Sequence, residues 1–161
     1  MGAAVTGAQG RRTGQGEAPF GLDRHTLAFR FRRRVRSTTP GINRAVRDIL
    51  KSAKLNGCLV DHQTELEIAL REALANAVFH GNRSDTAKSV LVRAYCDPKK
   101  GFVIAVRDEG PGFDPAKVPD PRREDRLHLT HGRGIFLMRE LMDHIEHRKG
   151  GREVVLYKKF A

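Results

Sequence analysis

The residues of this sequence best suited to chemistry lie in the stretch 65–82, ELEIALREALANAVFHGN. Glu72, Asn76 and His80 recur every four residues, so a helix here would stack them along one side. A carboxylate such as Glu72 can accept a proton from a nucleophile, and the side-chain oxygen of Asn76 is a hard donor that Mg²⁺ accepts beside phosphates. The alternative is a solvated helix face without a chemical role, because charged side chains mostly lie in water. The remaining positions supply an apolar side, formed by Leu66, Leu70, Ala73, Leu74, Ala77 and Val78.

Two glycine-containing turns further along the chain have chemical potential of their own. Asp108-x-Gly110-x-Gly112 follows a β-rich segment, so its carboxylate could accept a hydrogen bond from an exocyclic amine such as that of adenine. The two glycines would let the backbone approach a ring closely. Gly132-x-Gly134 precedes a helical pattern, and free N–H groups at a helix start can hold phosphate. Taken singly, each motif is more typical of an ordinary turn.

Two helices must position the residues of the first motif. Thr39 is a candidate N-cap with Pro40 at the first helical position, and Gly57 is suited to end this helix. The second helix carries the stretch described above. We expect Asp61 to cap it and the pair 81–82, Gly-Asn, to stop it.

A strand is predicted before the first helix, because from Leu27 onward apolar residues alternate with arginines. Arg33 interrupts the apolar side, so the strand is expected to end there. The basic side is compatible either with an edge strand protected against aggregation or with a face that binds a partner. The apolar side comprises Leu27, Phe29, Phe31 and Val35, and the basic side comprises Arg30, Arg32, Arg34 and Arg36.

Further strands are expected as hairpins. Segments 89–96 and 102–106 are rich in β-forming residues and flank a turn that contains proline and glycine. The polar, patternless stretch that follows Asp114 is too long for a simple connection and is expected to be a mobile loop covering a ligand. A helix from residue 132 and a last hairpin over 145–159 complete the chain.

Composition indicates a small globular protein. The 161 residues are 39% hydrophobic and 30% charged, which suits a single domain over 22–161 after a flexible, Gly- and Gln-containing tail over 1–21. No apolar run is long enough to cross a bilayer and no signal-peptide pattern is visible, so a cytoplasmic location without a membrane partner is expected. The net charge of +11 is compatible with nucleic acid, an acidic protein or an anionic ligand.

The two cysteines, Cys58 and Cys96, lie in apolar patterns without a CxxC motif or paired histidines. We therefore expect buried thiols rather than a disulfide or a zinc site.

The order of the three motifs, with a long loop between the last two, resembles the ATP-binding superfamily of gyrase, the heat-shock chaperone, histidine kinases and the mismatch-repair ATPase, the GHKL superfamily. The resemblance covers about residues 27–159. It implies a Bergerat-type ATP-binding fold: a two-layer α/β sandwich (α+β class) with a mixed, mostly antiparallel sheet covered on one face by about three helices. Nucleotide would lie between the helix layer and the loop.

Within this superfamily, segments 72–82 and 132–143 are most similar to the anti-sigma-factor serine/threonine-protein kinases of bacterial partner switching. Phe79 stands where the gyrase branch has an acidic residue, and the chain has no segment for the dimerising helical hairpin of sensor histidine kinases. The resemblance implies ATP and Mg²⁺ as cofactors, and an anti-anti-sigma protein and a sigma factor as partners. It also implies a homodimer.

By matching position, the resemblance assigns roles to individual residues. Glu72 would be the general base, Asn76 would ligate Mg²⁺ and Asp108 would read adenine. An arginine among Arg122, Arg123, Arg126 and Arg133 would neutralise charge on the transferred phosphoryl group. Structural alternatives are that His80 caps the helix end and that the arginines are solvated. The positions that match the nucleotide-binding motifs are Asn76, His80, Asp108, Gly110, Gly112, Gly132, Arg133 and Gly134.

One position departs from the superfamily pattern. A threonine often follows the glycine of the final hairpin and supports the adenine-reading aspartate through water, and here the corresponding residue is Arg152. Three functions therefore follow from the sequence, in decreasing order of support. They are an anti-sigma protein kinase, a non-catalytic module that uses ATP to dock a partner, and nucleic-acid binding through the arginine-rich strand. The last is ranked lowest because no cluster of base-stacking aromatic residues accompanies the arginines.

Overall fold

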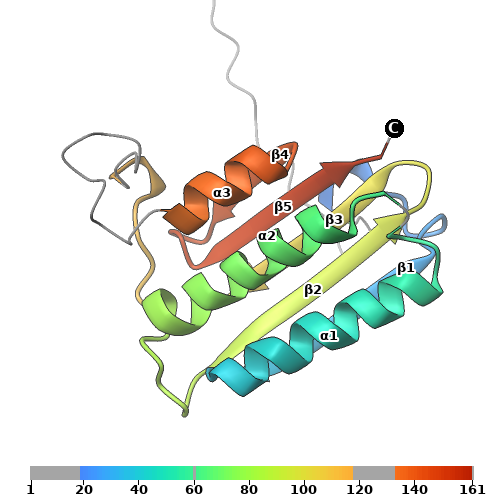
Figure 1. The fold of residues 1–161 in the computed structure, drawn as a ribbon. Helices are drawn as coiled ribbons and strands as arrows, with labels where there is room; N and C mark the ends of the chain where they lie inside the picture. The colour runs from blue at the N-terminus through green and yellow to red at the C-terminus, as the bar shows by residue number, and fades with distance from the viewer. Residues whose placement is uncertain (1–18, 60, 118–132, 161) are drawn as a thin grey trace, which may run out of the picture.

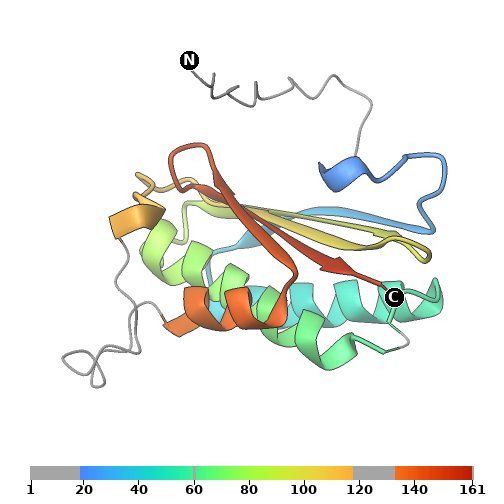
Figure 2. The same ribbon diagram turned by 90° about the horizontal axis from the view of Figure 1, so that it is seen from above.

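The computed structural model describes residues 19–59, 61–117 and 133–160. Five strands form one sheet in the order β1-β2-β3-β5-β4, and every neighbouring pair is antiparallel. Three α-helices cover one face of this sheet (Figures 1 and 2), which confirms the predicted two-layer architecture. The bounds are β1 Phe29–Arg36, α1 Thr39–Leu55, α2 Gln63–Ala75, β2 Ser89–Asp97, β3 Gly101–Arg107, α3 Arg133–Leu141, β4 His144–Arg148 and β5 Glu153–Lys159.

The first strand and helix differ in detail from the expectation. β1 continues past Arg33 to Arg36, because the Arg33 guanidinium lies over the Phe31 ring and pairs with Asp48 of α1 at 2.5 Å. The prediction that the strand ends at Arg33 was therefore wrong. The cap of α1 is Thr38, whose hydroxyl oxygen accepts a hydrogen bond from the N–H of Gly41 at 3.1 Å; Thr39, the expected cap, is already helical.

The second helix begins after His62 rather than at an Asp61 cap. The Nδ1 atom of His62 lies 2.9 Å from Oε2 of Glu65, so this pair occupies the first turn instead. From Asn76 to Gly81 the helix continues as a π-turn (η2), in which the N–H of Asn82 donates to the carbonyl of Ala77 at 2.8 Å. The helix stops at 81–82 as predicted, but its last turn is wider than an α-helical one.

The predicted hairpins are present as β2–β3 and β4–β5. The main core lies between the helices and the inner face of the sheet. A smaller cluster on the outer face contains Leu22 and Val155, and Phe20 stacks on Tyr157 there with ring centroids 5.4 Å apart. In Figure 2 the short turn Pro19–Gly21 lies on the side of the sheet opposite the helices. Within the described part of the chain, no helix has the length and apolar character needed to cross a bilayer.

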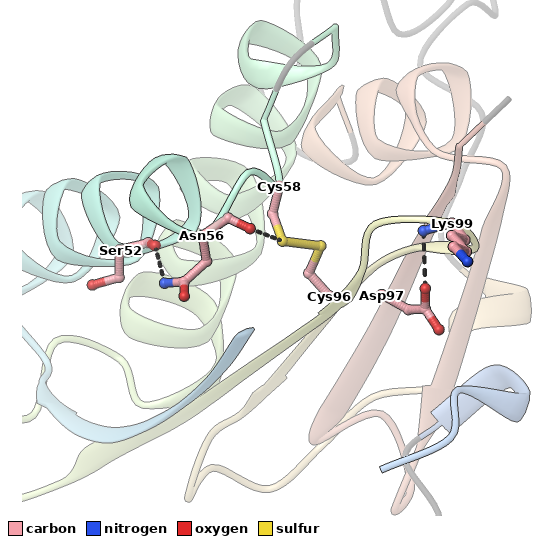
Figure 3. The surroundings of a disulfide bond; sticks show 6 residues. All are labelled: Ser52, Asn56, Cys58, Cys96, Asp97 and Lys99. Atoms are coloured by element: carbon pink, nitrogen blue, oxygen red, sulfur yellow. Dashed lines mark hydrogen bonds between the residues drawn. A yellow bond between two sulfur atoms is a disulfide. The ribbon is translucent and has the colours of Figure 1, made fainter. Parts of the chain in front are cut away.

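Cys58 and Cys96 form a disulfide, which corrects the expectation of two free thiols. Their Cα atoms are 6.3 Å apart, and both residues are buried, as expected. Cys58 follows the end of α1, where Asn56 donates to the carbonyl of Ser52 at 2.7 Å (Figure 3). Cys96 lies near the end of β2. The pairing joins the helix layer to the sheet across a sequence separation of 38 residues, a proximity that the spacing alone does not reveal.

Candidate functional site

The start of α3 lies directly against two of the predicted site residues on α2. A Cβ placed on Gly134 would be 2.5 Å from Oε2 of Glu72, 3.4 Å from Nδ2 of Asn76 and 3.5 Å from its Oδ1. Both side chains are half-buried. A side chain at position 134 would have to displace the Glu72 carboxylate, and α3 therefore brings its first turn next to a carboxylate and an amide.

The Asp108-x-Gly110-x-Gly112 motif contacts the continuation of the same helix at Gly81, just over one turn beyond Asn76. Asp108 follows β3 and is buried, and its carboxyl group lies against Gly81, where an added Cβ would collide with it. A Cβ on Gly110 would collide with the carbonyl group of Gly81. Oδ1 of Asp108 accepts a hydrogen bond from the N–H of Gly110 at 2.7 Å. The turn that carries the aspartate is thus packed onto the end of the helix that carries Glu72 and Asn76.

The last hairpin supports this turn from the other side. The N–H of Phe113 donates to the carbonyl of Gly150 at 3.0 Å, and Gly112 adopts φ +81°, which favours glycine. The carbonyl of Arg152 accepts a hydrogen bond from the N–H of Asp108 at 2.9 Å. Arg152 stands where the superfamily often has a threonine, and it is thus hydrogen-bonded to Asp108 through its backbone carbonyl.

The remaining predicted site residues lie at exposed positions or outside the described part of the chain. His80 lies in the π-turn and is exposed, and Arg133 is exposed at the first position of α3. Gly132 lies outside the described residues, as do Arg122, Arg123 and Arg126 and most of the expected covering loop.

Asn82 is a site residue that sequence reasoning missed. Its side chain is fully buried, and its Nδ2 donates to Ser37 Oγ at 2.8 Å and to the carbonyl of Ser89 at 3.0 Å. Its Oδ1 accepts from the N–H of Glu109 at 2.8 Å, immediately after Asp108. The residue therefore joins the helix end, β2 and the aspartate turn. The signal was present in the pair 81–82, which was interpreted only as a helix stop.

Replacing Asn82 with alanine is expected to lower the free energy of unfolding by about 2–4 kcal/mol, because buried groups lose their partners. Chemical denaturation measures this loss. Asn43→Ala is the matched control: Asn43 is exposed and accepts one hydrogen bond from Arg71 at 3.1 Å, so its loss should stay within about 0.5 kcal/mol. Equal losses in the two variants would contradict the role given to Asn82.

Burial raises the pKa of the Asp108 carboxyl above its ordinary 3.8, against opposing effects from the Gly110 N–H and the Arg152 charge. The folded chain therefore binds this proton more tightly than the unfolded chain does. The resulting stability is complete below pH 3.8 and is lost as the pH rises through the raised pKa. At neutral pH the ionised side chain lowers stability, a cost typical of functional groups.

Asp108→Asn is expected to remove this cost while keeping an oxygen for the Gly110 N–H. The free energy of unfolding of the wild type, minus that of the variant, should decrease as the pH rises from about 4 to 7. Urea denaturation of both proteins over that range measures the difference, in which other titrating groups cancel. A difference that is constant or increases with pH would exclude the predicted pKa shift.

The family model of the histidine kinase-like ATPase domain matches residues 35–158, from the end of β1 to the last residue but one of β5. The chain belongs to the histidine kinase-like ATPase family. It is 28% identical over 107 residues to the anti-sigma F factor of Clostridium perfringens (strain SM101), covering 62% of this chain and 74% of the relative. It is also 29% identical over 89 residues to the anti-sigma F factor of Halalkalibacterium halodurans, covering 54% of this chain and 60% of that protein.

Membership of this ATPase family implies that the chain binds ATP. The site is chemically suited to it: a buried carboxylate, close-packed glycines and the start of a helix all adjoin α2 and its π-turn. Among the described residues, no group of three His, Cys, Asp or Glu side chains could hold a metal ion.

Proposed function

We propose that this histidine kinase-like ATPase is an ATP-dependent serine/threonine-protein kinase and anti-sigma factor that phosphorylates a small anti-anti-sigma protein. The observation that best supports the proposal is the contact of Gly134, at the start of α3, with Glu72 and Asn76. In the proposed roles, a proton acceptor and an oxygen for Mg²⁺ would then lie beside N–H groups suited to hold phosphate. The similarity to two proteins named anti-sigma F factor supports the choice of partners.

Glu72 is the proposed general base. Its carboxylate would accept the proton of a partner's serine or threonine hydroxyl as the hydroxyl oxygen forms its bond to the γ-phosphorus. The bond between the γ-phosphorus and the bridging oxygen would break, and ADP would leave with that oxygen. Packing against Gly134 limits the directions in which the carboxylate can turn, which favours a fixed geometry for proton transfer.

Asn76 would hold Mg²⁺ and the segment 132–134 would border the phosphates. When bound, Mg²⁺ would neutralise the charge on the phosphate oxygens. Asp108 would accept a hydrogen bond from the amino group of adenine through Oδ2, because Oδ1 already binds the Gly110 N–H. Asp108→Asn would place an N–H donor there, so we expect ATP affinity to fall about 10- to 100-fold while the protein stays folded.

The regulatory logic is an exchange between two partners. A phosphate adds about −1.5 to −2 charges to the antagonist, which would weaken its binding and leave the kinase free to hold a sigma factor. We extend the proposal to a homodimer, which sedimentation of the purified chain tests directly.

The deciding experiment has two parts, both on the full chain. Calorimetry with ATP and Mg²⁺ tests nucleotide binding, and absence of binding would remove the proposal entirely. Incubation with γ-labelled ATP and a purified anti-anti-sigma protein from the same organism tests transfer. Label on a serine or threonine of that protein is the expected result. ATP binding without transfer would instead assign the chain as a non-catalytic module that docks its partner.

A further inference from the structure

The outer face of β1 carries a row of positive charge that the ATP site does not use. β1 is an edge strand that pairs only with β2 among the described strands. Alternate side chains of a strand share a face about 7 Å apart, so four of them span about 20 Å. All four are exposed. We call them the basic row: Arg30, Arg32, Arg34 and Arg36.

The charge of the basic row is only slightly neutralised within the molecule. Arg34 has one acidic neighbour, Glu109 at 3.6 Å, in an ion pair that is largely exposed. Arg30 donates a hydrogen bond to the carbonyl of Arg24. No carboxylate of the described residues lies within ion-pair distance of Arg32 or Arg36. Like charges on one strand face repel each other, so the row does not stabilise the fold.

The inner side of the same strand is, by contrast, fixed and partly apolar. Arg33 is held by Asp48 at 2.5 Å, and Phe31 packs beneath it against the main core. An extended segment added to this edge would thus have alternate side chains facing the basic row and the apolar border of α1. Its main chain would hydrogen-bond to the unpaired side of β1.

We propose that the edge of β1 binds an extended acidic segment of a protein partner, in which carboxylates alternate with apolar residues and meet the basic row. A second copy of β1 does not fit, because arginines would face arginines across the pair. Nucleic acid fits less well, because it has no peptide main chain to pair with the free edge of β1. The exposed large apolar residues Leu55, Phe79 and Phe113 lie on other elements, so the basic row offers little aromatic surface for base stacking.

The test uses a fluorescent peptide of alternating glutamate and valine, with fluorescence anisotropy on the full chain. Arg32→Ser/Arg36→Ser is expected to weaken binding about 5- to 10-fold, the size of two exposed ion pairs. The control Lys51→Ser/Lys54→Ser removes the same charge from exposed positions of α1 and should change affinity less than about twofold. Equal losses in the two variants would overturn the proposal.

Two further measurements test the mode of binding and the class of ligand. The first distinguishes strand addition at the β1 edge from purely electrostatic binding, and the second distinguishes a peptide from nucleic acid. N-methylation of the peptide backbone should weaken binding about tenfold, because it removes the N–H groups that pair with β1. Unchanged binding of the methylated peptide would exclude strand addition. A single-stranded DNA oligonucleotide of equal charge should bind more weakly than the peptide. Tighter, row-dependent binding of the DNA would replace the proposal with a nucleic-acid site.

Discussion

Glu72→Gln is expected to lower the rate of phosphoryl transfer to the anti-anti-sigma protein about 10²- to 10⁴-fold, the usual contribution of a general base. Glutamine keeps the shape that packs against Gly134 but cannot accept the hydroxyl proton. The affinity for ATP should change by less than about threefold, because the proposed contacts to nucleotide belong to other residues. Single-turnover transfer of labelled phosphate measures the rate, and calorimetry measures the affinity.

Two comparisons make this result specific. Glu67→Gln removes a carboxylate of the same helix that pairs with Arg71 at 3.1 Å on the surface, and it should leave both rate and affinity near wild type. Asn76→Ala should lose nucleotide binding as well as transfer, because its oxygen is the proposed ligand of Mg²⁺. A Glu72→Gln protein that transfers phosphate at the wild-type rate would falsify the assignment of the base.

Reduction of the Cys58–Cys96 disulfide is expected to lower the free energy of unfolding by about 4 kcal/mol, from the chain entropy of a loop of this length. For a domain of this size the melting temperature should fall by about 8–16 °C. ATP affinity should not change, since Glu72 lies nine residues after the start of α2 at Gln63, about 14 Å along the helix. Thermal melts with and without a phosphine reductant measure the effect.

The matched control is the Cys58→Ala/Cys96→Ala protein, whose melting temperature should not respond to reductant. Its cavity lowers stability in both conditions, so the comparison isolates the bond from the loss of packing. A wild-type protein that melts at the same temperature with and without reductant would show that the bond contributes nothing. The bond is at odds with the cytoplasmic location expected from the sequence, because disulfides are rare in reducing compartments.

Much of the fold could be predicted from the sequence, because local patterns agree with the tertiary structure. The alternation of apolar and basic residues in β1 reports one buried face, and the apolar spacing of α2 reports the side that packs on the sheet. The hairpins followed from β-rich segments around Pro- and Gly-containing turns. The site was predictable in part, because Glu72 and Asn76 share a helix face and Gly134 has no side chain to separate it from them.

The features that the sequence did not predict depend on contacts between distant segments. Arg33 looked like the end of a strand until its partner Asp48 was known. The disulfide joins residues that nothing in their spacing relates. Asn82 follows a glycine in a pair typical of a turn. Its side chain is buried and hydrogen-bonded only because β2 and the aspartate turn pack against it in the folded protein. Periodicity reports which side of an element is buried but does not identify its neighbours.

The π-turn between Asn76 and Gly81 also constrains how this protein can vary in evolution. Deleting one residue from 77–80 would restore an α-helical turn and rotate everything after it by about 100°. Gly81 would then lose its contact with the carboxyl group of Asp108, and Asn82 would lose its hydrogen bond with the N–H of Glu109. We therefore expect natural length changes to be absent from this turn and to accumulate instead in the exposed connection 83–87.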